Sequence, residues 1–441
     1  MSVLVRGGTV LTLNDRFDVI DGDVSIRDGV IAEIASNIAG PHDQVIEARG
    51  GYVLPGFVQT HIHLCQTLFR GFADDLPLMD WLRARVWPME AAHSPDTLRS
   101  AVRLATTELL ATGTTSVLTM ETVHDTDVVF EAVEESGMRA TIGKCMMDLA
   151  SDVPIRLRER THDSVDESLA IHKRWHGRAG GRLRAAFAPR FAVSCSRALL
   201  ESVAALSRDH QALVHTHASE SRDELAIVNT LSGGLTNLEY LASLHLASPR
   251  LCTAHCVWVD EREQHLMADH EVKVMHCPGS NLKLGSGVAP VHEMRALGIT
   301  VSLGADGAAC NNRLDMFDEM RLAAVLQAMR RAPGALPARD VVWMATRDGA
   351  RTLGLEQEIG SIEAGKRADI IVVDRDRPHM ATGPDPYSTL VYSARGTDVR
   401  TTIVDGKVLV NDFEPVRVDR MEVAVDARRS ARALATRAGI R

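Results

Sequence analysis

Two histidine pairs in this sequence have the spacing of metal ligands. His61 and His63 form the first pair and His215 and His217 the second, each within a short apolar stretch. Residues two apart on a β-strand point to the same face, so both imidazoles of a pair can approach one ion. Spacing alone does not choose between His215 and His217. Because His217 lies nearer the end of its stretch, we predict that it binds the metal and that His215 lies a layer deeper, in a supporting role.

A carboxylate closes another apolar stretch. Asp306 follows the apolar run 301–305, where a buried carboxylate needs a metal or another cation as its partner. Together with His61, His63 and His217, it would leave room for a water on a single ion, which is typical of hydrolytic metal sites.

Other polar residues at the ends of apolar stretches suggest proton chemistry. His255 ends one stretch and is predicted to hold the attacking water. Glu220 comes three residues after His217 and is predicted to carry a proton to or from the substrate. A further stretch ends in Arg190 rather than in a lysine, which argues against a second metal bridged by a modified lysine.

Short apolar runs that alternate with helical segments must position these residues. Eight runs over about 250 residues are the arithmetic of a (β/α)₈ barrel, an α/β fold whose chemistry lies at the carboxyl ends of its strands. The runs are 53–63, 115–120, 140–147, 183–190, 213–218, 251–259, 272–278 and 299–306.

Both chain ends are rich in β-forming residues, and we expect them to pair into one small β-sandwich domain beside the barrel. The predicted organisation is 1–54 for the first part of the β-sandwich, 55–366 for the barrel, 367–412 for the second part and 413–441 for a helical tail. The tail is basic and rich in alanine, and we expect a solvated surface helix there.

The composition is that of a globular enzyme. The chain has 441 residues, of which 45% are hydrophobic and 24% charged, and its net charge is −9. An acidic chain of this kind is a poor binder of nucleic acid. Neither a membrane-spanning run nor a signal peptide is visible. The seven scattered cysteines form no C-x-x-C pair, so we expect reduced thiols and a cytoplasmic location.

The motifs that carry these residues resemble the amidohydrolase superfamily. They are "PGFVQTHIHLCQTLFRG", "HTHASES", "TAHCVW", "HCPGSNLKLGSG" and "LGADGAACNN". The resemblance is to the branch that holds methylthioadenosine/S-adenosylhomocysteine deaminases, 5′-deoxyadenosine deaminases, guanine deaminase and the triazine hydrolases. It implies one Zn²⁺ or Fe²⁺ held by His61, His63, His217 and Asp306. It also implies a small-molecule substrate and a homo-oligomer, either a dimer or a tetramer.

Within this branch, the residues around the pocket point to two substrate classes. Glu90 in "VWPMEAAH" matches the glutamate that contacts the ribose hydroxyls of adenosine derivatives, and "GADGAACNNRLDMFDEMR" is also similar to those deaminases. However, Arg190 follows Pro189 where those deaminases usually carry a histidine, and Arg190-Phe191 instead resembles guanine deaminase. Gln66 has a counterpart there and in the triazine hydrolases. An arginine fork suits an oxo group or a carboxylate.

The sequence therefore predicts a metal-dependent deaminase of a 5′-deoxyadenosine, methylthioadenosine or S-adenosylhomocysteine type of nucleoside. Glu220, His255 and Asp306 would do the proton chemistry, and Glu90, Arg190 and Gln66 would bind the substrate. Deamination of guanine or a pterin, and hydrolysis of an s-triazine, remain the alternatives.

Overall fold

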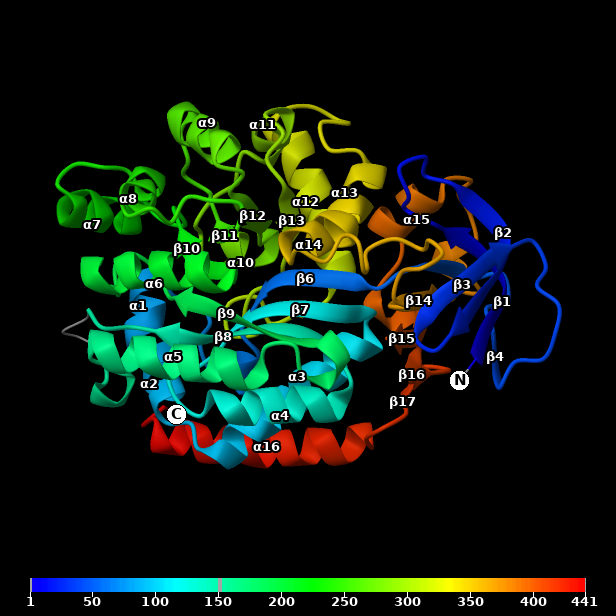
Figure 1. The fold of residues 1–441 in the computed structure, drawn as a ribbon, viewed down its shortest axis with the longest axis horizontal. Coiled ribbons are helices and arrows are strands. Elements are labelled where there is room, and N and C mark those ends of the chain that lie inside the picture. The colour runs from blue at the N-terminus through cyan, green and yellow to red at the C-terminus, as the bar shows by residue number, and fades with distance from the viewer. Residues whose placement is uncertain (1, 150–152, 441) are drawn as a thin grey trace.

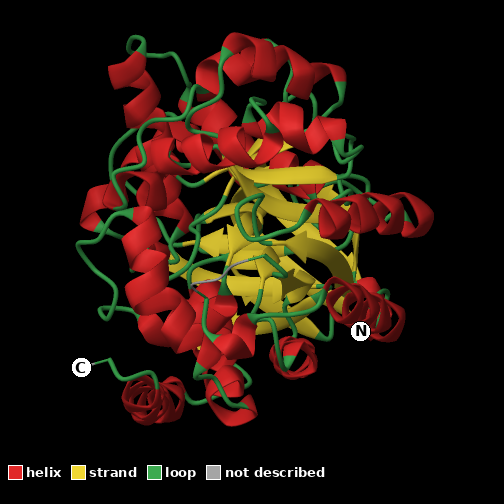
Figure 2. Ribbon diagram, turned by 90° about the vertical axis from the view of Figure 1, so that its left-hand side faces the viewer, coloured by secondary structure: helices red, strands yellow, loops and turns green. Residues whose placement is uncertain are grey.

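The computed structural model describes residues 2–149 and 153–440. Its centre is an eight-stranded parallel sheet in sequential order, curled into a barrel with helices around it (Figure 2). The predicted barrel is thereby confirmed. Its strands are β6 (Phe57–Ile62), β7 (Thr114–Met120), β8 (Arg139–Met146), β9 (Leu183–Pro189), β10 (Val214–Ala218), β11 (Leu251–His255), β12 (Lys273–His276) and β13 (Val301–Leu303).

The barrel strands are buried on both faces because helices cover the outside and side chains fill the inside. Every residue of β7 and β8 is buried, for example. The outer layer and its connections are formed by helices in chain order. They are α1 (Leu78–Trp81), α2 (Trp87–Ala91), α3 (Pro95–Ala111), α4 (Thr126–Ser136), α5 (Thr161–Trp175), α6 (Arg197–His210), α7 (Arg222–Ser232), α8 (Asn237–Ser243), α9 (Glu261–Asp269), α10 (Pro278–Lys283), α11 (Val291–Ala296), α12 (Met316–Arg330), α13 (Ala338–Ala345) and α14 (Arg347–Thr352).

Short helical turns of other kinds complete these connections. A π-helical turn, η2 (Leu82–Val86), joins α1 to α2. The 3₁₀ turns are η1 (Leu64–Phe69), η3 (Ile155–Leu157), η4 (Ala179–Gly181), η5 (Pro378–Met380) and η6 (Gly396–Asp398).

The first and last strands of the barrel meet through hydrogen bonds next to the candidate ligands. The Asp306 amide donates to the His61 carbonyl at 3.0 Å, and the Thr60 hydroxyl donates to the Leu303 carbonyl at 3.0 Å. A Cβ on Gly304 would lie 2.6 Å from the His61 carbonyl oxygen, so this approach requires glycine. Closure of the barrel therefore places His61 and Asp306 side by side.

A second sheet, mostly antiparallel, combines strands from both chain ends and lies beside the barrel (Figure 1). The predicted pairing of the two ends is thereby confirmed. Its N-terminal strands are β1 (Ser2–Leu11), β2 (Val19–Arg27), β3 (Val30–Ala35), β4 (Gln44–Glu47) and β5 (Tyr52–Pro55). Its C-terminal strands are β14 (Ile370–Val373), β15 (Val399–Val404), β16 (Lys407–Asn411) and β17 (Glu414–Pro415), with α15 (Pro386–Tyr392) between β14 and β15.

The C-terminal helix α16 (Arg420–Arg437) is docked on the barrel, which corrects the expected solvated helix. It packs along α3 and runs along the outer edge of the barrel in Figure 1. Val423, Ala427 and Leu434 are buried on its inner face, while Arg428, Arg429 and Arg432 are exposed. At its end Arg437 donates to the Ala92 carbonyl at 2.9 Å. Apolar residues four and seven apart thus form a buried stripe, which the basic composition of the segment did not indicate.

Among the described helices, none is long and apolar enough to cross a bilayer.

A buried ion pair joins the barrel to the second sheet. Arg139 at the start of β8 donates to both carboxylate oxygens of Asp369, at 2.8 and 3.1 Å. Both side chains are 2% exposed. The Asp405 amide also donates to Asp369, at 2.8 Å. The pair therefore couples the position of the small sheet to that of the barrel.

We expect the substitution Arg139→Leu to lower the free energy of unfolding by about 3–5 kcal/mol, because Asp369 would stay buried without its cation. Urea denaturation of both proteins measures this difference. Arg184→Leu is the matched control, since its ion pair with Glu358 is partly exposed and is worth about 1 kcal/mol or less. Equal losses in the two variants would contradict the assignment.

Candidate active site

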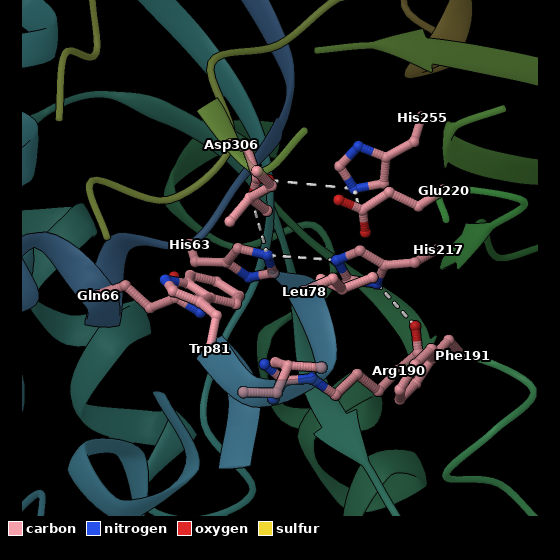
Figure 3. A pocket seen from close by; sticks show the side chains of 12 residues that line it. His63, Gln66, Leu78, Trp81, Arg190, Phe191, His217, Glu220, His255 and Asp306 are labelled. Carbon is pink, nitrogen blue, oxygen red and sulfur yellow. Dashed lines mark hydrogen bonds and ion pairs between the residues drawn. The ribbon is translucent and has the colours of Figure 1, made fainter. Parts of the chain in front are cut away.

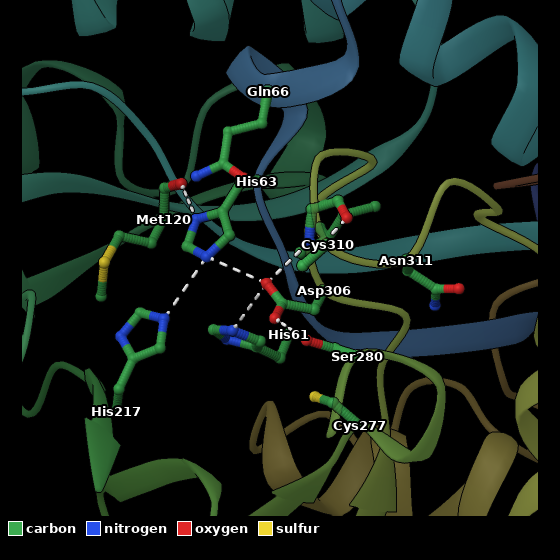
Figure 4. A network of polar contacts seen from close by, with 12 residues as sticks. His61, His63, Gln66, Met120, His217, Cys277, Ser280, Asp306, Cys310 and Asn311 are labelled. Atoms are coloured by element: carbon green, nitrogen blue, oxygen red, sulfur yellow. Dashed lines mark hydrogen bonds and ion pairs between the residues drawn. The ribbon is translucent and has the colours of Figure 1, made fainter. Parts of the chain in front are cut away.

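Four side chains converge at the carboxyl ends of β6, β10 and β13. The Asp306 Oδ1 atom lies 3.3 Å from His61 Nε2 and 3.2 Å from His63 Nε2. The His217 Nε2 atom lies 3.4 Å from His63 Nε2. Figure 4 shows the three imidazoles and the carboxylate around one point. These are the four ligands predicted from the strand ends.

Each of the three histidines contacts the protein through its Nδ1 atom and points its Nε2 atom toward the common point. His63 Nδ1 donates to the Met120 carbonyl and His217 Nδ1 donates to the Arg190 carbonyl, both at 2.7 Å. His61 Nδ1 lies 2.7 Å from Nε2 of His215, which sits a layer deeper and is fully buried. Partners of this kind set the tautomer and the ring direction of metal-binding histidines.

The geometry of these donor atoms fits a metal ion. The groups His61, His63, His217 and His61, His255, Asp306 each have donor atoms within 4.8 Å of one another. A tetrahedron with metal–ligand bonds of about 2.1 Å has edges of about 3.4 Å. The distances from Asp306 Oδ1 to His61 and His63, 3.3 and 3.2 Å, and from His63 to His217, 3.4 Å, match this value. The His61 Nε2 atom is buried and has no hydrogen-bond partner among the described residues. An ion at this point would satisfy it.

The electrostatics of the cluster also suit a cation. Burial lowers the pKa of His61 to about 4 and that of His217 well below its ordinary value, so both imidazoles are neutral and free to bind a metal. Burial alone would raise the pKa of Asp306, but His61 and His63 outweigh it and hold that pKa well below the usual range. The aspartate is therefore an anion at neutral pH.

His255 and Glu220 lie beside the four ligands and lack a strong partner on the side that faces the pocket. The His255 Nε2 atom is 3.5 Å from Glu220 Oε2 and 3.9 Å from Asp306 Oδ2. Burial raises the pKa of Glu220 to about 7, against the opposing effect of His255. His255 and Asp306 both have left-handed backbones, with φ of 72° and 64°. Such strain in non-glycine residues gathers at functional sites.

The pocket in front of this cluster has apolar walls and one cationic corner. In Figure 3, Asp306, His255 and Glu220 lie together, with Arg190 on the opposite side of the pocket. The lining residues are His63, Gln66, Leu78, Trp81, Leu82, Arg190, Phe191, His217, Glu220, His255, Leu284 and Asp306. Aromatic and aliphatic walls with a few polar groups at the edges are the kind of lining that binds a flat heterocycle.

Glu90 lies behind the pocket wall and accepts hydrogen bonds from the other two predicted substrate-binding residues. Arg190 donates to both of its carboxylate oxygens, at 2.7 and 3.2 Å, and Gln66 donates to Oε1 at 3.0 Å. Glu90 is 4% exposed. The structure thus brings the three residues together, with Arg190 and Gln66 on the pocket surface.

Sequence reasoning missed several residues that shape the site. The Glu121 carboxylate accepts from the Leu64 and Cys65 amides at 3.1 and 3.0 Å and so holds the loop after His63. Trp81 forms a pocket wall, and its indole nitrogen has no partner among the described residues. A glutamate directly after the run 115–120 was the visible signal for Glu121. Trp81 follows no strand, so the barrel rule could not find it.

Comparison with known proteins places the chain among metal-dependent hydrolases. Residues 52–409 match the model of the amidohydrolase family. A 5′-deoxyadenosine deaminase of Methanothermobacter thermautotrophicus is 42% identical over 94% of each chain. A 5-methylthioadenosine/S-adenosylhomocysteine deaminase of Thermococcus onnurineus is 40% identical over 94% of this chain and 95% of that one.

A solved structure agrees with this assignment along nearly the whole chain. An adenosine deaminase from Xanthomonas campestris with bound zinc superposes with a TM-score of 0.92, covers 98% of both chains and is 32% identical. The resemblance noted in the sequence is thereby confirmed, and so is the prediction of a hydrolase acting on carbon–nitrogen bonds. With its barrel, its second sheet and its histidine–aspartate cluster, this chain belongs to the amidohydrolase family.

Proposed function

We propose that this protein is a hydrolytic deaminase of an adenine nucleoside derivative, of the 5′-deoxyadenosine, methylthioadenosine or S-adenosylhomocysteine type. It would release ammonia and leave the inosine analogue. The observation that carries the proposal is the meeting, in one pocket, of a three-histidine, one-aspartate cluster with a buried glutamate whose pKa is about 7. The deaminases that are similar over nearly the whole chain support the substrate class.

His61, His63, His217 and Asp306 would hold one Zn²⁺, and the bound zinc of the Xanthomonas campestris relative supports this choice of ion. Such an ion supplies a water of lowered pKa, which is a nucleophile at neutral pH.

The remaining steps are the work of this chain's own side chains. Asp306 accepts the proton of the attacking water, and His255 orients the water's oxygen toward the ring carbon that bears the amino group. Burial raises the pKa of Glu220 to about 7, so a large share of this side chain carries a proton at neutral pH. It donates that proton to the adjacent ring nitrogen, so that the C=N bond accepts the nucleophile. Asp306 then gives its proton to the amino group, and ammonia leaves as the carbon–nitrogen bond breaks. The hydroxyl proton on the same carbon returns to Glu220 as the ring carbonyl forms.

Arg190 and Gln66 supply the polar edge of the pocket, and Glu90 supports them from behind. In the nucleoside assignment, Arg190 or Gln66 shifts so that the carboxylate of Glu90 can accept hydrogen bonds from the ribose hydroxyls, because Glu90 does not itself line the pocket in this structure. The alternative is deamination of guanine or a pterin. One observation favours this alternative. Arg190 and Gln66 line the pocket, and the Gln66 Oε1 atom has no partner among the described residues, so polar groups at the edge of such a ring could bind there.

The test is ammonia release by the zinc-loaded protein from a small panel of compounds. The panel holds 5′-deoxyadenosine, methylthioadenosine, S-adenosylhomocysteine, adenosine, guanine, a pterin and a chlorotriazine. Turnover confined to the adenine nucleosides supports the proposal. Turnover confined to guanine, the pterin or the triazine overturns the substrate class and leaves the metal chemistry standing.

The role of Glu90 can be tested on the substrate side. We expect Glu90→Ala to raise KM for the nucleoside by about 10- to 100-fold, because a hydrogen bond to a charged group is worth about 1.5–3 kcal/mol. The free base adenine makes no ribose contact and serves as the control ligand, so its inhibition constant should change much less. An equal change for nucleoside and base would contradict the ribose assignment and point to Arg190 as the affected group.

A further inference from the structure

One segment outside the ligand set contacts all three proton-handling residues. It follows β12 and consists of α10 and the loop to residue 287. Ser280 donates to Asp306 Oδ2 at 2.7 Å, and Ser286 donates to Glu220 Oε1 at 3.2 Å. Asn281 Oδ1 lies 2.9 Å from His255 Nδ1. The segment thus supplies one hydrogen bond to each of the three groups.

We propose that Asn281 is a positioning residue for the reaction, which accepts the Nδ1–H of His255 and thereby turns an unprotonated Nε2 toward the attacking water. This inference rests on the proposed function of the site. A neutral imidazole has one donor and one acceptor nitrogen. With Oδ1 facing Nδ1, the proton lies on Nδ1 and the lone pair on Nε2.

The rings of His61 and His217 pack against His255, but within the described part of the chain its one side-chain hydrogen bond is to Asn281. The ring is fully buried, and among the described residues its Nε2 atom has no hydrogen-bond partner. Its Nε2 faces Glu220 at 3.5 Å and Asp306 at 3.9 Å, between which the reacting water would lie. The contact with Asn281 therefore determines that Nε2 presents a lone pair, rather than a proton, to the reacting water.

Asn281 is itself held rigidly. Its backbone amide donates to the Cys277 carbonyl at 3.0 Å, and its backbone carbonyl accepts from the Ser286 amide at 2.8 Å. The second of these bonds also places the Ser286 hydroxyl that contacts Glu220. The main chain of Asn281 thus links the orientation of His255 to that of Glu220.

A contribution to the stability of the fold does not explain the side-chain amide of Asn281. Its Nδ2 atom is buried and has no partner among the described residues. An unsatisfied buried donor costs about 1–3 kcal/mol, which an aliphatic side chain would avoid. Asn281→Leu removes this donor and leaves the Nδ1–H of His255 unsatisfied instead, so we expect little net change in stability.

The test compares three variants of the zinc-loaded full chain. Asn281→Leu removes the acceptor, Asn281→Asp keeps an acceptor at the same place, and Gln327→Leu is the control for the loss of a buried amide elsewhere, since Gln327 bonds to the Ala289 carbonyl. Measured are kcat and KM for a compound that the wild type deaminates, metal per chain, and the melting temperature.

We expect Asn281→Leu to lower kcat by about 10²-fold, within the range for positioned acid–base groups, with KM, metal content and melting temperature nearly unchanged. Asn281→Asp should restore most of kcat, and Gln327→Leu should leave kcat as in the wild type. A wild-type kcat in Asn281→Leu overturns the proposal. So does an Asn281→Asp variant as inactive as Asn281→Leu, because Asn281 would then act as a donor, and so does a loss of kcat that follows a loss of metal.

A readout that needs no turnover separates this proposal from the proposed function. In protein labelled with ¹⁵N-histidine, long-range proton–nitrogen correlation spectra report the tautomer of each imidazole, and a His255→Gln variant identifies the signals of His255. We expect Nδ1–H in the wild type and loss of this preference in Asn281→Leu. An Nε2–H tautomer in the wild type overturns the proposal, whereas a protein that deaminates no adenine nucleoside overturns only the proposed function.

Discussion

Glu220→Gln is expected to lower kcat by about 10³-fold while leaving one metal ion per chain. Glutamine has nearly the same size and shape as glutamate, but its amide is not acidic enough to give a proton to the substrate ring. Positioned acid–base groups contribute about 10²–10⁴-fold to a rate. The metal should stay because Glu220 is not among the four converging ligands; its carboxylate contacts His255, at 3.5 Å, and the Ser286 hydroxyl, at 3.2 Å. Ammonia release and metal analysis on the same sample measure both effects.

The pH dependence of the wild type provides a second signature of Glu220. Burial raises the pKa of Glu220 to about 7, His255 opposes this shift, and Asp306 and Glu224 add to it. The acid form therefore predominates below pH 7 and is lost as the pH rises through that value. We expect kcat/KM to fall above about pH 7, and the residual activity of Glu220→Gln to lack this limb.

A buried glutamate elsewhere in the fold serves as the control. Glu263 is 2% exposed and accepts from the Leu238 and Asp260 amides near α9. Glu263→Gln should retain kcat and metal even where it costs some stability. A Glu220→Gln protein with kcat within tenfold of the wild type, or one that has lost its metal, would contradict the acid role.

His217→Asn is expected to lose both the metal and all measurable turnover. The imidazole Nε2 of His217 lies 3.4 Å from that of His63, and its Nδ1 is fixed by the Arg190 carbonyl. Asparagine is shorter and cannot bring a nitrogen to the same point. Loss of one of four ligands leaves a site too weak to retain the ion through dialysis.

Thermal unfolding gives an independent measure of the same loss. Metal present at 100 times its dissociation constant stabilises the folded state by about 2.7 kcal/mol. A chelator should therefore lower the melting temperature of the wild type and have no effect on His217→Asn.

His245→Asn is the matched control for this substitution. His245 is exposed and has a left-handed φ of 62°, which asparagine tolerates well. This variant should bind metal as the wild type does. Metal retained at one ion per chain in His217→Asn would show that the ligand set is wrong.

Much of the candidate site could be predicted from the sequence because a barrel converts strand ends into neighbours. His61, His63, His217 and Asp306 come from three strands, and the rule for barrel active sites places them at one face. Position along the strand, rather than side-chain periodicity, separated His217 from His215. The structure puts His215 behind His61, at 2.7 Å.

Contacts between segments far apart in the chain could not be predicted in this way. Glu90, Gln66 and Arg190 lie on a helix, a 3₁₀ turn and a strand end, and nothing in their local sequence pairs them. Asn281 was visible inside "HCPGSNLKLGSG", but its partner His255 lies 26 residues away. Such contacts depend on how loops fold over the barrel mouth, which no periodicity encodes.

The most direct test of the account is deamination of 5′-deoxyadenosine by the zinc-loaded protein in water labelled with heavy oxygen. The account predicts one ammonia per molecule of product, and a product that carries one heavy oxygen on the purine ring where the amino group was. No ammonia, or release of free adenine with an unlabelled ring, would contradict it.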